Sequence, residues 1–234
     1  MIERKPIRRK FIFRTIVFLV ILYLYMFNLE MLTEIINYRL GDVKVYHVIW
    51  LLLMLEMLQI LLPKYNRHIS CGKIFARHFR EKKVPYDKKE VLEYTKKYNR
   101  RAGWAGFFWL TLLFLIGIFY FARIIDLISI HLIAVFFYFS DEFCINVWCP
   151  FRAWIVRNKC CNACRIYNWS HFMIFSPFIF IFSFWTYSLL VMSLVIFIQW
   201  EYLHYKYPER FSELSNANLK CGDCPERVQN CRFV

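Results

Sequence analysis

The stretch IYNWSHFMIFSPFIFIFSFWTYSLLVMSLVIFIQW, residues 166–200, contains no Asp, Glu, Lys or Arg. A membrane-spanning helix needs about 20 mainly apolar residues, so this stretch is long for one span and short for two. A single tilted helix would place the following chain on the opposite face of the membrane. A re-entrant pair of half-helices, turning near Trp185 and Thr186, would return it to the same face. Since irregular backbone at membrane depth must be satisfied by protein or water, the path of this stretch decides the fold.

Four more apolar blocks precede it, at residues 11–27, 46–62, 104–122 and 124–139. The first three are long enough to span, and the fourth is expected as the return leg of a tight hairpin turning near Arg123. The chain is 59% hydrophobic, against about 45–50% in soluble domains. We predict an all-α, polytopic integral membrane helical bundle of about five transmembrane segments, the last either single or re-entrant. Residues 1–200 form the transmembrane domain and residues 201–234 a cysteine-containing C-terminal tail.

The net charge of +14 is concentrated beside the apolar blocks. Residues 63–103 hold 13 Lys and Arg against 4 Asp and Glu, and the first 14 residues are also basic. The positive-inside rule therefore predicts a cytoplasmic N-terminus and a cytoplasmic basic loop 63–103, in the cell membrane, with anionic lipids as partners and no nucleic acid. Within this loop, residues 87–101 are expected to form a basic helix after Pro85, capped by Asp87.

Eight of the nine cysteines fall into two groups, one in the loop 141–171 and one in the tail, while Cys71 stands alone as a residue typical of apolar burial. The candidate metal ligands are Cys144, Cys149, Cys160, Cys161 and Cys164 in the loop, and Cys221, Cys224 and Cys231 in the tail. The groups lie in polar, charged segments, which apolar burial explains poorly. Whether they share one site depends on the path of residues 166–200.

Three chemistries fit these cysteines. A disulfide between the neighbours Cys160 and Cys161 would be strained, and the basic residues around them favour the reducing cytoplasm. Zinc would use two C-x2-C pairs, Cys161 with Cys164 and Cys221 with Cys224, brought together by the fold.

Iron–sulfur chemistry uses four thiolates for each cubane cluster, and ferredoxins place a proline directly after one ligand. The pairs Cys149-Pro150 and Cys224-Pro225 match that feature, and eight cysteines would serve two clusters, although no complete ferredoxin run is present. We therefore expect one or two [4Fe–4S] clusters first and zinc second.

The functional hypothesis is an integral membrane redox protein that exchanges electrons with a soluble donor or a membrane quinone. The alternatives are a membrane scaffold or transport accessory protein with structural zinc, and a thiol–disulfide exchange protein working through Cys221 and Cys224. No nucleotide-binding or hydrolase motif is present, and the sequence leaves open whether the protein is an enzyme.

Ionisable residues in the apolar blocks are the remaining candidates. Glu56 is expected either as a functional carboxylate or as a protonated group bonded to a neighbouring helix. His131 is expected as a satisfied interior histidine, with a proton relay or quinone contact as the alternative. His171 adjoins the cysteine loop and is considered as an extra ligand, whereas His68 and His78 are expected on a solvated segment.

Overall fold

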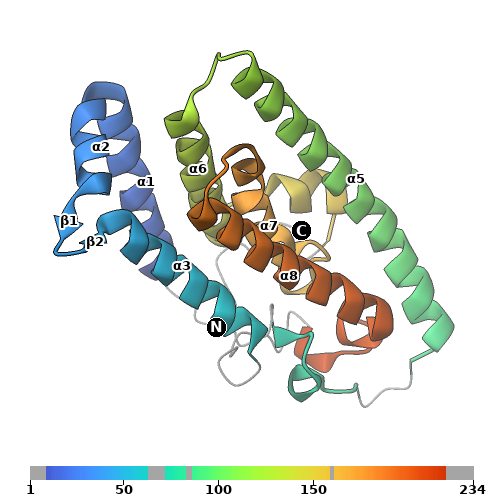
Figure 1. Cartoon of the computed structure of the whole chain (residues 1–234). Coiled ribbons are helices and arrows are strands. Elements are labelled where there is room, and N and C mark those ends of the chain that lie inside the picture. Colours follow the sequence, from blue (N-terminus) through green and yellow to red (C-terminus); the bar gives the residue numbers. More distant parts are fainter. Residues whose placement is uncertain (1–8, 63–71, 83–85, 159–160, 220–234) are drawn as a thin grey trace.

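The computed structural model describes residues 9–62, 72–82, 86–158 and 161–219, and helices dominate it (Figure 1). The described helices and strands are α1 (Arg9–Phe27), α2 (Leu29–Asn37), β1 (Arg39–Leu40), β2 (Val43–Lys44), α3 (Val45–Leu61), α5 (Lys88–Phe121), α6 (Leu127–Asn146), α7 (Ser170–Phe175) and α8 (Phe184–Lys206). Single helical turns between them are η1 (Ala76–His78), η2 (Phe151–Val156), η3 (Cys161–Ala163), η4 (Tyr167–Trp169), η5 (Ser176–Phe180), η6 (Pro208–Arg210) and η7 (Ala217–Leu219). Apart from the short antiparallel hairpin β1–β2, the predicted helical class is confirmed over these residues.

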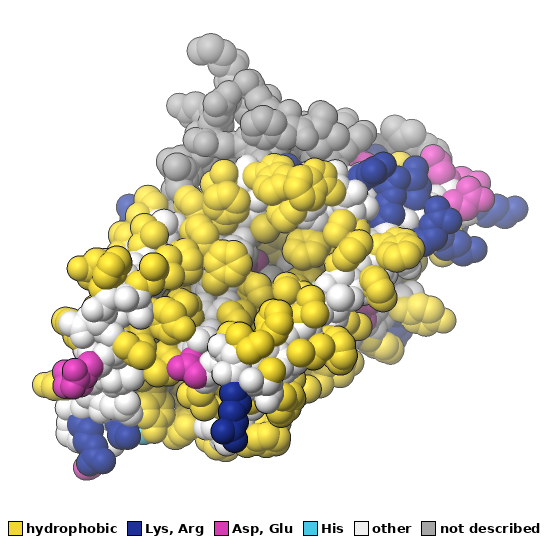
Figure 2. Space-filling model, turned by 90° about the horizontal axis from the view of Figure 1, so that it is seen from above, with side chains coloured by type: hydrophobic (Ala, Val, Ile, Leu, Met, Phe, Trp, Pro, Cys, Tyr) yellow, Lys and Arg dark blue, Asp and Glu magenta, His cyan; other side chains and the backbone are white. Residues whose placement is uncertain are grey.

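Four of the described helices, α1, α5, α6 and α8, are long and apolar enough to cross a membrane. The block predicted as the second span forms α3, which has only 17 residues and is therefore a shorter apolar helix. It ends at Leu61 because Leu62 has an extended backbone, which is the conformation favoured before a proline such as Pro63. On the face that Figure 2 shows, much of the described surface is apolar, and most charged side chains lie toward its edges.

The basic helix predicted at residues 87–101 and the apolar block after it form one continuous helix, α5, of 34 residues. The Asp87 side chain caps its start by accepting a hydrogen bond from the Lys89 amide at 2.9 Å. All charged residues of α5 lie before residue 102. At 1.5 Å per residue the helix is about 51 Å long. Its uncharged part, residues 102–121, therefore accounts for only part of this length, and the charged part continues the same helix away from it.

The chain turns at Arg123, as predicted, and α6 runs back. Arg123 has a left-handed backbone with φ of 58°, and Asp126 caps α6 by accepting a hydrogen bond from the Ser129 amide at 2.7 Å. The helix α1 lies antiparallel to α6, with Tyr25 bonded to Ser129 near one end and Phe18 stacked on Phe139 further along.

Residues 166–200 divide into two antiparallel parts. The turns η4 and η5 and the helix α7 form the first part, and α8 forms most of the second. Tyr187 of α8 donates a hydrogen bond to the Ile179 carbonyl at 3.1 Å, and the Trp169 ring packs against Phe197 at 5.5 Å. One continuous helix over this stretch is therefore wrong.

The turn lies at residues 181–183, slightly before the position expected near Trp185. The Thr186 hydroxyl donates to the carbonyls of Ile181 and Ser183 at 2.9 and 3.1 Å, which satisfies the backbone where the helical pattern breaks. A side-chain hydroxyl in the first turn of α8 therefore stabilises the corner.

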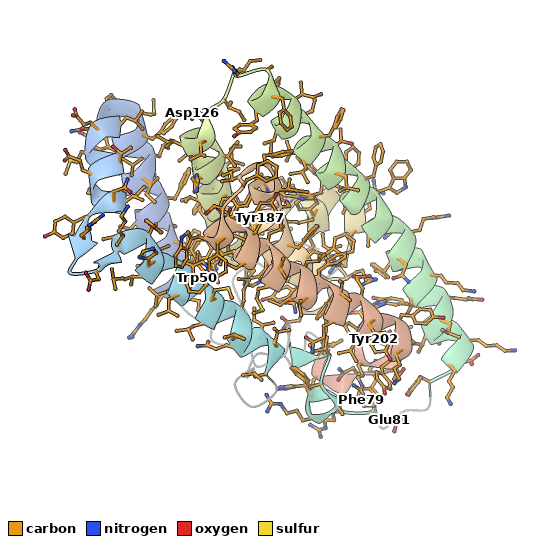
Figure 3. The ribbon with its side chains drawn as sticks, viewed as in Figure 1. Trp50, Phe79, Glu81, Asp126, Tyr187 and Tyr202 are labelled. Carbon is orange, nitrogen blue, oxygen red and sulfur yellow. The ribbon has the colours of Figure 1, made fainter. Side chains whose placement is uncertain are left out.

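The helix α3 runs parallel to α8, where Trp50 donates a hydrogen bond to Ser188 at 2.8 Å. The main apolar core lies between α3, α6, α7 and α8; its buried members include Met57, Ile130, Ala134, Ile174, Phe175 and Ile196. Asp126 and Glu81 lie toward opposite ends of the bundle (Figure 3). We call the end with residues 122–126 and 181–183 the Arg123 end, and the end with residues 72–82, 147–158, 161–169 and 207–219 the cysteine end.

Candidate thiol site at the cysteine end

Two segments from distant parts of the sequence are joined at the cysteine end. The Ala217 amide donates to the Arg80 carbonyl at 2.8 Å, and the Lys82 amide donates to the Ser215 carbonyl at 3.1 Å. The Asn218 side chain also donates to the His78 carbonyl at 2.9 Å. Residues 207–219, the described part of the chain after α8, are therefore fixed to residues 72–82 of the basic loop.

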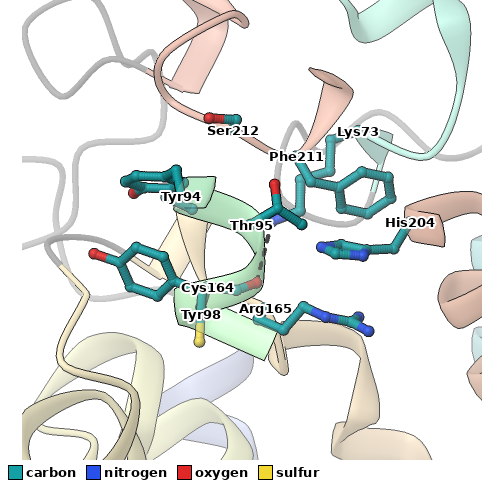
Figure 4. A pocket seen from close by; sticks show the side chains of 10 residues that line it. Lys73, Tyr94, Thr95, Tyr98, Cys164, Arg165, His204, Phe211 and Ser212 are labelled. Carbon is teal, nitrogen blue, oxygen red and sulfur yellow. Dashed lines mark hydrogen bonds between the residues drawn. The ribbon is translucent and has the colours of Figure 1, made fainter. Parts of the chain in front are cut away.

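Lys73 links these segments to the cysteine loop. Its side chain is fully buried, and its ammonium donates to the Cys164 carbonyl at 3.2 Å (Figure 4). It also donates to the Asn162 carbonyl at 2.6 Å. The same ammonium lies 5.0 Å from the centroid of the Trp200 ring. A buried cation needs such compensation, and here backbone carbonyls and an aromatic face supply it.

Arg165 ties the cysteine loop to the last turns of α8. Its guanidinium forms a two-pronged ion pair with the Glu201 carboxylate, which also accepts from the Trp169 indole at 2.6 Å. The Trp200 indole in turn donates to the Arg165 carbonyl at 3.0 Å. Because the loop meets α8 at its C-terminal part, both flanks of the stretch 166–200 lie at the same end of the bundle.

Four predicted ligands lie within the described residues at this end. Cys144 is in the last turns of α6, Cys149 precedes η2, and Cys161 and Cys164 begin and follow η3. The thiols of Cys144 and Cys149 are hydrogen-bonded, and the Cys161 sulfur lies 4.0 Å from the Cys144 carbonyl oxygen. The fold therefore brings the two halves of the loop group together. The other predicted ligands, Cys160, Cys221, Cys224 and Cys231, lie outside the described residues, as do Cys71 and His68.

The thiols of this group differ in their acidity. The hydrogen bond from Cys144 is the main cause that lowers the pKa of Cys149 to about 7, and the amide and charge of Arg152 act in the same direction against burial. Burial raises the pKa of Cys164 to about 11. Cys149 is therefore the thiol that is readily ionised, and a thiolate is the form that binds metals and attacks disulfides.

Among the described residues, no three His, Cys, Asp or Glu side chains are grouped so that they could hold a metal ion. The predicted eight-cysteine ligand set includes four residues beyond that part of the chain, so the set remains a prediction.

The cavity beside Cys164 has a volume of about 20 Å³, which is room for one water molecule (Figure 4). Lys73, Tyr98, Cys164, His204 and Phe211 are among the residues that line it. A substrate molecule would not fit in this cavity.

A charge network joins three helices on the side of the bundle near α1. The guanidinium of Arg14, only 3% exposed, donates to Asp141 at 2.8 Å and to Glu56 at 3.0 Å, and it lies 3.7 Å from the centroid of the Tyr138 ring. Lys10 also donates to Glu56 at 3.0 Å. Since two cations share one oxygen of Glu56, the alternative of a protonated Glu56 does not fit.

Among the described residues, no predicted histidine joins two cysteines in a group that could hold a metal ion. His171 is within electrostatic reach of Asp141 and Glu56, and its ring nitrogens have no hydrogen-bond partner in the described part of the chain. His131 bonds the Leu127 carbonyl at 2.8 Å, in agreement with a satisfied histidine. His78 lies in η1, where its ring accepts a hydrogen bond from Arg77.

Sequence reasoning missed Lys73, Arg14 and Asp141. Lys73 is one of many basic residues in its loop, and no pattern marks it as buried. Arg14 lies inside an apolar block, and a charged residue in such a block indicates a buried partner of opposite charge. The sequence therefore contained the signal from which its pairing with Glu56 could have been predicted.

Comparison with family models, curated proteins and solved structures gives no match for this chain. The class is thus defined by the fold alone: a helical chain with four helices able to cross a membrane by length and composition, compatible with a membrane protein.

Proposed function

We propose that this chain is an integral membrane redox protein whose cysteine end holds a thiolate-bound iron–sulfur centre on the cytoplasmic side of the cell membrane. The centre would exchange electrons with a soluble donor or a membrane quinone. The observation that carries the proposal is the meeting of Cys144 and Cys149 with the separate segment that holds Cys161 and Cys164.

The proposed arrangement in the membrane has five segments. The helix α3 would be the fifth, since 17 residues span about 26 Å and a modest mismatch with the hydrocarbon core is tolerated. The stretch 166–200 would enter and leave on the cytoplasmic side, because both of its flanks meet through Arg165 and Glu201. The basic residues of 72–103 then lie on the side that the positive-inside rule predicts.

The electrostatics of this end support an anionic metal centre. Lys73 and Arg152 are both at most 3% exposed, and both favour the ionised form of Cys164. Thiolate centres carry net negative charge, so buried cations nearby would stabilise them. The tail cysteines begin at Cys221, two residues after Leu219, so the proposed ligand set includes them.

Metal analysis tests this proposal. Protein purified without oxygen should be brown and contain iron and acid-labile sulfide, and Cys149→Ser should lose most of both. Cys71→Ser is the matched control and should keep them. Colourless protein loaded with zinc would contradict the iron–sulfur assignment and favour the scaffold or transport accessory role.

A second candidate, thiol–disulfide exchange, is favoured by the Cys144–Cys149 thiol pair. The Cys149 thiolate would attack a partner's disulfide and release one partner thiolate, which takes up a proton. Cys144, losing its proton, would then attack Cys149 of the mixed disulfide and release the second thiolate. The partner gains two electrons and the chain is left with a Cys144–Cys149 disulfide. Metal-free protein with this disulfide, formed reversibly in a redox buffer, would support this candidate.

A further inference from the structure

An open groove lies between α5 and the turn η2, on the outside of the bundle. It has a volume of about 250 Å³ and is lined by Arg101, Trp104, Phe108, Trp154, Ile155 and Arg157. The two arginines give it a double positive charge, and no carboxylate is among the lining residues. Its chemistry therefore combines an anion-binding part with an aromatic, apolar part.

The groove lies at the polar–apolar boundary of α5. Arg101 is the last charged residue of that helix, and residues 102–121 carry no charge. Trp104 and Trp154 are 57% and 67% exposed, which is unusual for such large rings in water but typical of the headgroup level of a bilayer. In a bilayer the arginines would therefore lie at the level of the lipid phosphates, and Phe108 would lie further along the groove, in the uncharged part of α5.

The backbone of η2 holds both guanidinium groups. Arg101 donates to the Val156 carbonyl at 3.2 Å, and Arg157 donates to the Trp154 carbonyl at 3.1 Å. Within the described residues each guanidinium makes only this one hydrogen bond, so most of its five N–H donors remain available. A guanidinium binds phosphate oxygens through two parallel bonds, which a lysine cannot do.

We propose that this groove binds an acidic phospholipid, with Arg101 and Arg157 on the headgroup phosphate and an acyl chain along Phe108. The charge of the lining residues selects an anionic headgroup, and the aromatic wall continues into the apolar face of α5. This site is independent of any metal at the cysteine end.

Native mass spectrometry of the whole chain in detergent tests the proposal, with phosphatidylglycerol and phosphatidylcholine as probes. The protein should retain phosphatidylglycerol, and R101Q/R157Q should weaken its binding by at least about tenfold, because charge-assisted bonds are lost. The control is K96Q, which removes an exposed charge of α5 outside the groove and should bind as the unchanged protein does.

Several results would overturn the proposal: equal binding of phosphatidylcholine, unchanged binding by R101Q/R157Q, equal weakening by K96Q, or displacement of the lipid by a quinone. Circular dichroism checks that the double variant folds. If the double variant does not fold, the single variant R157Q, which changes an exposed side chain, is measured in the same way. Unchanged binding of phosphatidylglycerol by R157Q would contradict the proposed site.

Discussion

The two ends of the bundle are built in different ways. At the Arg123 end, connections are short and closed by local bonds: Asp126 caps α6, and Thr186 satisfies the turn at residues 181–183. At the cysteine end, connections are long and held by distant partners, such as Lys73 on the cysteine loop and Asn218 on His78. The difference shows that one end only reverses the chain, whereas the other brings distant thiols and cations together.

The largest expected effect comes from the charge network that joins α1 to α3 and α6. Arg14→Met leaves Glu56 and Asp141 without their buried cation, and breaking a buried ion pair costs about 3–5 kcal/mol. The free energy of unfolding, measured by titration with SDS in mixed micelles, should fall by that amount. A change below about 1 kcal/mol would mean that the network contributes as little as an exposed pair.

The second prediction concerns thiol reactivity in reduced, metal-free protein. Cys149, with a pKa lowered to about 7, should gain reactivity toward iodoacetamide as the pH rises through 7, whereas Cys164, with a pKa raised to about 11, should not. At pH 7 the larger thiolate fraction of Cys149, partly offset by its weaker nucleophilicity, predicts that Cys149 is alkylated at least about tenfold faster than Cys164. Mass spectrometry of the alkylated peptides measures both rates. Equal rates at pH 7 would contradict the assigned acidity.

The third prediction tests the anchor of the cysteine loop. Lys73→Met removes a cation that bonds two carbonyls, so the free energy of unfolding should fall by about 2–3 kcal/mol. Lys96→Met, at an exposed position of α5, is the control and should change it little. If both variants unfold alike, Lys73 does not hold the loop.

The smallest effect is expected for Lys10→Met. Lys10 bonds the same carboxylate as Arg14, but its side chain is 61% exposed, so its loss should cost less than about 1 kcal/mol. The same SDS titration compares the two variants directly. If Lys10→Met lowered the free energy of unfolding as much as Arg14→Met does, burial would not determine how much these ion pairs contribute to stability.

Sequence patterns predicted the helical class, the turn at Arg123 and the Asp87 cap, because apolar periodicity and local capping are short-range properties. They could not choose the path of residues 166–200, which depends on Thr186 and on the pairing of Arg165 with Glu201. They also divided the cysteines into a loop group and a tail group without showing that the thiols of Cys144 and Cys149 are hydrogen-bonded. The pair Arg165–Glu201 joins residues 36 positions apart, and long-range contacts of this kind leave no periodic trace.

The proposed topology places the cysteine loop and the segment after α8 on one side of the membrane. This topology can be tested with single cysteines introduced at Ala153, Glu213 and Asp42. Intact cells and inverted vesicles are labelled with a membrane-impermeant maleimide, and peptide mass spectrometry shows which cysteines have reacted. We expect Ala153→Cys and Glu213→Cys to react only in inverted vesicles, and Asp42→Cys, at the β1–β2 turn, to react only in intact cells. Labelling of Ala153→Cys and Glu213→Cys from opposite sides would contradict it.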